Sequence, residues 1–238
     1  MANMAVKQLQ FERVISLSHP INPSIPLWPG DPPVAFEDVA SLERDGYYLR
    51  RFSMGEHSAT HMNAPNSFYA DGMGIEGYSA EALVRPAVVI NVRGKAAADP
   101  DYQVSPQDIH AWEHQHGPID AGSVVLVYTG WQHLWNDPTA FFGHDAQGSH
   151  FPGIGEATIG FLLEHRQIAG VGIDTHGVDY GQSSAFAINH AVLAENGIVL
   201  ECLTQLDRLP ATGATLVIGI LALEGGSGSP ASVMAFIP

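Results

Sequence analysis

Four short runs of almost purely apolar residues constrain the fold of this 238-residue chain most strongly. Strands buried on both faces consist of continuous Val, Ile and Leu, whereas half-exposed strands alternate between apolar and polar residues. The four runs are residues 87–92, 123–128, 168–173 and 198–201. Helical patterns separate them, so the sequence predicts a single α/β domain over residues 1–238 with a central, buried mixed sheet.

Weaker patterns complete this outline. Ser105 and Pro106 begin a helix that we expect to end near Gly117, because serine is a good N-cap and proline suits the first helical position. Six prolines between Pro20 and Pro33 require an extended or turned segment. Further expected strands are 12–18, 47–54, 214–223 and 232–237, further helices are 79–84, 156–166 and 185–195, an irregular loop is 137–153, and a flexible N-terminus is 1–10.

Charge and missing motifs exclude several classes of function. The chain has 10 basic and 25 acidic residues, a formal charge of −15, which argues against binding to nucleic acid or to an anionic membrane surface. A P-loop and a G-x-G-x-x-G following a strand are both missing, so we expect no nucleotide cofactor. The single cysteine, Cys202, and the lack of a signal or membrane-spanning pattern lead us to expect a cytoplasmic protein.

The stretch from His57 to Ser67 contains the strongest candidate chemistry. In an extended segment, side chains at positions of the same parity lie on one side, so His57, His61, Asn63 and Ser67 would share a face. Imidazole ligands suit zinc, manganese or iron. Two histidines and an amide do not complete a metal site, however, and hydrogen-bonded histidines in a polar loop are the other reading.

The segment His57-Ser-Ala-Thr-His61-Met-Asn63-Ala-Pro65 resembles the H-x-G-T-H-x-D-x-P-x-H signature of the cyclase family of metal-dependent hydrolases, which includes kynurenine formamidase, isatin hydrolase and trans-dienelactone hydrolase. The likeness extends over nearly the whole chain. Further matching segments are residues 28–32, 86–90, 129–131, 172–175, His190 followed by Glu201, and 224–228. The resemblance implies a swivelling β/β/α-type fold and a homodimer or homotetramer, with the proline-rich segment near a neighbouring active site.

The resemblance also implies site residues. His57 and His61 match the first two histidines of the motif, His190 matches a later histidine, and Glu201 matches a late carboxylate. These four residues are the catalytic candidates. The candidate ligands of one divalent metal, zinc or manganese, are His57, His61, Asn63 and Glu201.

Three positions depart from the family pattern. Asn63 replaces an aspartate, Ser67 replaces the last motif histidine, and Ala59 replaces a glycine. A neutral amide cannot bridge two cations as a carboxylate does, and a hydroxyl is a poorer ligand than an imidazole, so two metal ions are disfavoured.

The sequence thus supports a formamidase-like hydrolase of a small amide, lactam, lactone or ester, with water activated by one metal ion and a histidine as proton shuttle. The alternative is a family member with a decayed metal site, acting as a metal-independent acid–base catalyst or a small-molecule binding protein. The candidate substrate-binding residues are Trp28, Asn63, Ser67, Phe68 and His176.

Overall fold

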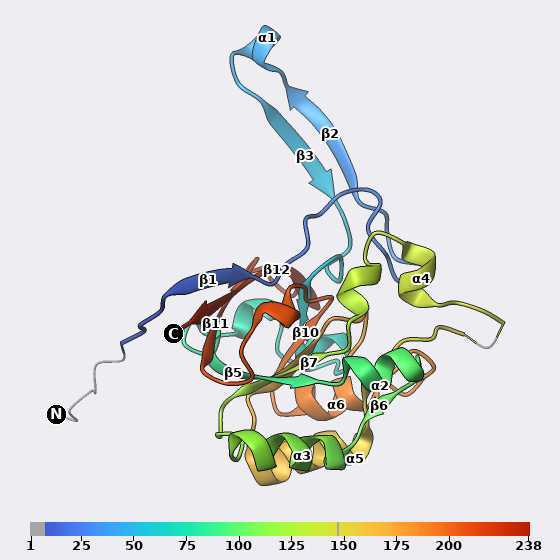
Figure 1. Cartoon of the computed structure of the whole chain (residues 1–238). Coiled ribbons are helices and arrows are strands. Elements are labelled where there is room, and N and C mark those ends of the chain that lie inside the picture. The colour runs from blue at the N-terminus through green and yellow to red at the C-terminus, as the bar shows by residue number, and fades with distance from the viewer. Residues whose placement is uncertain (1–7, 147) are drawn as a thin grey trace.

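The computed structural model describes residues 8–146 and 148–238, and its centre is an eight-stranded mixed sheet (Figure 1). The strand order is β1-β12-β11-β5-β7-β9-β10-β4, and β12 also pairs with β4. Seven strands therefore form a closed ring, and β1 lies outside it along β12. This architecture confirms the expected α/β class with a central mixed sheet. Most of the expected flexible N-terminus, residues 1–7, lies outside the described residues.

The four apolar runs form the parallel part of the sheet. They are β5 (Val84–Asn91), β7 (Val124–Tyr128), β9 (Gly170–Ile173) and β10 (Ile198–Glu201). Both of their faces are covered, as the continuous apolar composition predicts. Alternate residues such as Val89 and Leu126 lie in one hydrophobic cluster, and their neighbours Val88 and Val125 lie in another, which packs against the helices.

Three helices supply that second cluster on the outer face of the parallel strands. They are α3 (Pro106–His116), α5 (Glu156–Arg166) and α6 (Ala187–Ala194). The helix start predicted at Ser105 and Pro106 is confirmed, and Ser105 caps α3 in a capping box with Asp108. All three helices occur where the sequence pattern predicts them, within a few residues at each end.

Antiparallel strands close the sheet. They are β1 (Arg13–Ser16), β4 (His61–Asn63), β11 (Ala214–Ile220) and β12 (Gly228–Ile237). The three residues of β4 pair with β10 on one side and with β12 on the other. The histidine stretch is therefore part of the seam that joins the two ends of the sheet.

A two-stranded arm projects from the body of the molecule (Figure 1). It consists of β2 (Ala35–Ala40), the short helix α1 (Leu42–Asp45) and β3 (Leu49–Ser53). The sequence predicted the second strand but not its partner. Large apolar side chains of the arm are exposed, including Leu42 at 70% and Phe52 at 55%. An isolated hairpin of this kind is marginally stable in water.

Short elements occupy the remaining connections, and two of them correct the sequence-based outline. The helix expected at 79–84 is a turn, in which the backbone N–H of Ala82 bonds to Ser79. The loop expected at 137–153 contains a helix that Asp137 caps. The short elements are α2 (Arg93–Ala98), β6 (Gln103–Val104), α4 (Pro138–Phe142), β8 (Gly153–Ile154), η1 (Pro65–Ser67), η2 (Ile75–Gly77), η3 (Trp131–Leu134) and η4 (Leu206–Arg208). In the described part of the chain, no helix is long and apolar enough to cross a membrane.

Candidate active site

Strand β4 presents His61 and Asn63 on the same side because side chains alternate along a strand. Met62, between them, points into the core inside the ring of strands. His61 and Asn63 are themselves 1% and 4% exposed. The alternation expected from the sequence therefore holds for these two residues, and both are polar groups that need partners inside the protein.

Glu201 lies directly opposite His61 in the antiparallel pairing of β10 with β4. Its Oε2 is 3.1 Å from His61 Nε2, and its Oε1 accepts a 3.2 Å hydrogen bond from the backbone N–H of Val178. Burial by itself would raise the pKa of Glu201, but the contact with His61 and the nearby His176 outweigh burial, so the pKa is lowered. Glu201 therefore carries a buried negative charge at neutral pH.

The other ring nitrogen of His61 fixes the orientation of the imidazole. Nδ1 is 2.8 Å from the carbonyl oxygen of Ala59, which can only accept, so Nδ1 carries a hydrogen and Nε2 faces Glu201. Ala59 has φ = 56°, a left-handed backbone that favours glycine. This backbone gives a physical reason for the glycine of the family pattern at this position.

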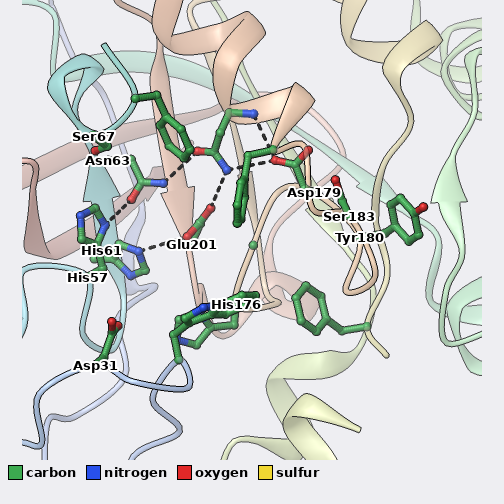
Figure 2. A pocket seen from close by; sticks show the side chains of 16 residues that line it. Asp31, His57, His61, Asn63, Ser67, His176, Asp179, Tyr180, Ser183 and Glu201 are labelled. Atoms are coloured by element: carbon green, nitrogen blue, oxygen red, sulfur yellow. Dashed lines mark hydrogen bonds and ion pairs between the residues drawn. The ribbon is translucent and has the colours of Figure 1, made fainter. Parts of the chain in front are cut away.

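An amide bridge connects the two histidines through the interior (Figure 2). Asn63 Oδ1 is 2.9 Å from His57 Nδ1, and Asn63 Nδ2 donates a 2.9 Å bond to Asn189 Oδ1. Asn189 Nδ2 donates to Asp179 at 3.1 Å and to Glu201 at 3.4 Å. Because the carboxylates only accept, the orientation of both amides is determined, and His57 Nδ1 must donate to Asn63.

His57 lies at the outer end of this bridge. Its Nε2 is 2.9 Å from the Ser227 hydroxyl, which is 2.7 Å from the Glu56 carboxylate. Burial is the main cause that lowers the pKa of His57. Ser67, in contrast, donates its hydroxyl hydrogen to the backbone carbonyl of Ser227. Ser67 lines the cavity but does not bond to either histidine in the described structure.

His190 lies beside the cavity and is not part of its lining. Its ring contacts Tyr69 and Phe68, with Nδ1 3.2 Å from the Tyr69 hydroxyl, and it is not among the residues that line the cavity. Asn189, one residue earlier on α6, faces the site instead, because neighbouring helical side chains diverge by about 100°. Asp179 holds this end of α6 by accepting the backbone N–H groups of Ile188 and Asn189.

These side chains open onto a cavity of about 240 Å³ with largely aromatic walls. The ring centroid of Trp28 lies 5.6 Å from that of His176 and 6.5 Å from that of Phe186. The ring centroids of Phe68 and Phe186 are 5.7 Å apart. His176 is buried, which lowers its pKa to about 4, and its Nε2 has no hydrogen-bond partner in the described structure. A neutral imidazole thus lines the cavity, and its Nε2 is buried without a partner in the described structure.

Comparisons with known proteins agree with this architecture. The Cyclase family model matches residues 15–180. The isatin hydrolase of Roseibium aggregatum is 34% identical over 218 residues, which are 87% of this chain and 82% of that protein.

The chain belongs to the cyclase family. Isatin hydrolase A from Ralstonia solanacearum has a similar structure, with a TM-score of 0.90 and 32% identity over 95% of this chain and 92% of that chain. A potential metal-dependent hydrolase with cyclase activity shares the fold, with a TM-score of 0.73 and 22% identity over 95% and 98% of the two chains. The expected family and the expected enzyme class, a hydrolase, are confirmed.

Within this cyclase-family chain, the residues offer few ligands to a metal ion. Among residues 8–146 and 148–238, no group of three or more His, Cys, Asp or Glu side chains is arranged to hold one. Two atoms do have the spacing of ligands. Ligands 2.0–2.2 Å from one ion lie about 3 Å apart, which is close to the 3.1 Å between His61 Nε2 and Glu201 Oε2. These two atoms are part of a possible site for one ion and do not complete it.

Sequence reasoning missed several residues of the site. Asn189 was missed because the next residue, His190, was the catalytic candidate on this helix. Asp179 and Asp31 line the cavity, and Glu56 and Ser227 support His57. Asp31 belongs to the proline-rich segment that resembles the family, and that resemblance was the one signal that could have identified it.

Proposed function

We propose that this protein hydrolyses a small aromatic lactam, amide or ester at its carbonyl group. The observation that carries the proposal is the buried His61–Glu201 pair at the floor of an aromatic-walled cavity. The isatin hydrolases that this chain resembles support a carbonyl–nitrogen bond in an aromatic ring system as the target. Trp28, Phe68 and Phe186 would hold the aromatic ring by stacking and edge contacts.

In this reaction the oxygen of a water molecule bonds to the carbonyl carbon, the bond from that carbon to nitrogen or oxygen breaks, and the leaving atom takes a proton. His57 is the proton carrier in the proposal. It faces the cavity, and Asn63 holds its Nδ1. Its Nε2 would exchange the bond with the Ser227 hydroxyl for one with the water or the leaving atom when it takes or gives the proton. The ring of His176 forms part of the wall against which the substrate would pack. His190 has no part in the proposed chemistry because it lies behind Phe68 and Tyr69.

Water activation has two candidates. In the first, His61, Glu201 and Asn63 would hold one divalent ion, zinc or manganese, and the ion would supply polarisation of the carbonyl and a lowered pKa of water. In the second, the hydrogen-bonded bridge of Asn63 and Asn189 makes the site independent of metal, and the histidines with Glu201 act directly. The closed bridge favours the second candidate, because each amide already has partners in the protein.

A panel of aromatic lactams, formanilides, lactones and aryl esters tests the reaction, together with elemental analysis of protein purified without chelator. Near-stoichiometric zinc or manganese, with activity lost on chelation and regained with that metal, supports the first candidate. Full activity after chelation supports the second. The absence of hydrolysis across the panel, with either preparation, refutes the proposed function.

We also propose that the protein is a homodimer or homotetramer in which the arm, β2–α1–β3, packs on another copy. The exposed apolar side chains of the arm support this arrangement, because an isolated hairpin would leave them in water. Sedimentation velocity measures the state directly, and a monomer at micromolar concentration would exclude the proposal.

A further inference from the structure

A tight turn presents two side chains to the cavity together. The backbone N–H of Asp31 donates a 3.0 Å bond to the carbonyl of Trp28. Between them, Pro29 occupies the second position of the turn, and Gly30 has φ = 98° at the third. Proline at the second position followed by a residue with positive φ is the pattern of a type II turn. The positive φ at the third position favours glycine. The turn thus ties the position of Asp31 to that of the Trp28 ring.

The two ends of the turn reach different parts of the cavity. Trp28 forms part of the aromatic wall beside His176 and Phe186. Asp31 points its carboxylate toward His57 and His61, as Figure 2 shows. An aromatic substrate held against Trp28 would therefore have its reacting group within reach of the Asp31 carboxylate.

Asp31 differs from the other two carboxylates that line the cavity. Asp179 accepts hydrogen bonds from α6, and Glu201 accepts from Val178 and contacts His61. In the described structure the Asp31 carboxylate has no hydrogen bond and no ion pair, and no lysine or arginine lines the cavity. Its acceptor capacity is therefore open to a ligand, and the protein offers it no donor of its own.

We propose that Asp31 accepts a hydrogen bond from the N–H group of the scissile amide, so that the site selects N–H lactams and anilides over lactones, esters and N-alkyl amides. This inference rests on the proposed function and specifies its substrate class. An ester oxygen has no hydrogen and would place a lone pair against the carboxylate. Asp31 is partly exposed in the free protein, but a bound substrate would shield its carboxylate from water. A site built to bond an N–H group discriminates against the analogue that lacks it, because the shielded acceptor is then left unpaired.

The hydrogen bond also fits the balance of the reaction. Water adds its oxygen to the carbonyl carbon, the C–N bond breaks, and the nitrogen gains the proton that the water loses. The original N–H remains on the nitrogen throughout, so Asp31 can hold that nitrogen in the substrate, the intermediate and the amine of the product. Asp31 is thus a specificity-determining residue that touches the reacting group.

The experiment compares isatin with N-methylisatin, which differ only at the nitrogen. We measure kcat/KM and, independently, the dissociation constant by titration calorimetry at short times or on ice. For the parent protein we expect kcat/KM to favour isatin by about 10- to 100-fold, the usual effect of a hydrogen bond to a charged acceptor. Asp31→Ala should reduce this ratio to about 1–3, and Asp31→Asn, which keeps an acceptor oxygen, should give an intermediate ratio.

A matched control removes one negative charge elsewhere. Glu164→Gln lies on the exposed face of α5 and should leave the ratio unchanged. A parent ratio near 1, or a ratio that stays high in Asp31→Ala because the methyl group is excluded by shape, overturns the inference. If no compound is hydrolysed, the proposed function fails, and the binding ratio still decides whether Asp31 recognises the N–H group.

Discussion

Replacing Asn63 by aspartate tests whether the amide bridge stabilises this site in place of a metal ion. In the parent, Asn63 Nδ2 donates to Asn189 Oδ1 at 2.9 Å, and Asn189 is held in its orientation by Asp179 and Glu201. In Asn63→Asp, a carboxylate oxygen would face the Asn189 amide oxygen at that distance, and neither atom can donate a hydrogen. The substitution also adds a negative charge near the carboxylates of Asp179 and Glu201. The unmade bond alone costs about 1–3 kcal/mol. For a chain of this size, that corresponds to a fall in Tm of roughly 2–12 °C.

The same substitution creates the carboxylate that the family pattern has at this position, so metal should now stabilise the variant. A divalent ion at 100 times its dissociation constant would return about 2.7 kcal/mol. Urea unfolding with chelator, and with zinc or manganese, measures both effects. Asn136→Asp is the control, because Asn136 is exposed and lies outside the bridge. The reasoning is refuted if Asn63→Asp is as stable as the parent in chelator, or if metal stabilises the parent equally.

Other residues give outcomes of different kinds. Glu201→Gln should lower kcat/KM at least about 100-fold, whereas His190→Gln should stay within about threefold in the same steady-state assay, since His190 faces away from the cavity. Burial lowers the pKa of His19 from 6.5 to about 4, so its contribution to stability is present above pH 6.5 and is lost as the pH falls toward 4; His19→Phe should flatten that part of a pH series of urea melts. If the arm packs on a second copy, Tm should rise with protein concentration in differential scanning calorimetry, and Phe52→Ser should remove the dependence.

The parallel part of the fold was predictable because strands that are buried on both faces have continuous apolar sequences. Strands β5, β7, β9 and β10 carry continuous apolar runs, and each appears where the run lies. The strand β2 was missed because Ala35–Ala40 contains two acidic residues and buries only Ala40. Strand β2 pairs only with β3, in a hairpin away from the core. The periodicity of a single segment does not reveal such a pairing.

The sequence predicts which side chains share the cavity where local spacing determines their direction, and does not where it leaves that direction open. His61 and Asn63 share a face because they alternate along a strand. For His190 the residue type suggested a role, yet a shift of one position on a helix turns the side chain away, and Asn189 takes the place. Asp31 depends on a turn whose direction is visible only in three dimensions.

The position of the site on β4 has a consequence for how the enzyme loses activity. Hydrogen bonds from β4 to both β10 and β12 close the ring, and two of its three residues, His61 and Asn63, belong to the candidate site. Opening that seam would separate His61 from Glu201 while the parallel strands and their helices remain packed. Local opening of a short strand requires less free energy than global unfolding. We therefore expect inactivation by mild denaturant to precede the main unfolding transition, with the backbone amides of residues 61–63 exchanging their hydrogens earlier than those of β7 and β9.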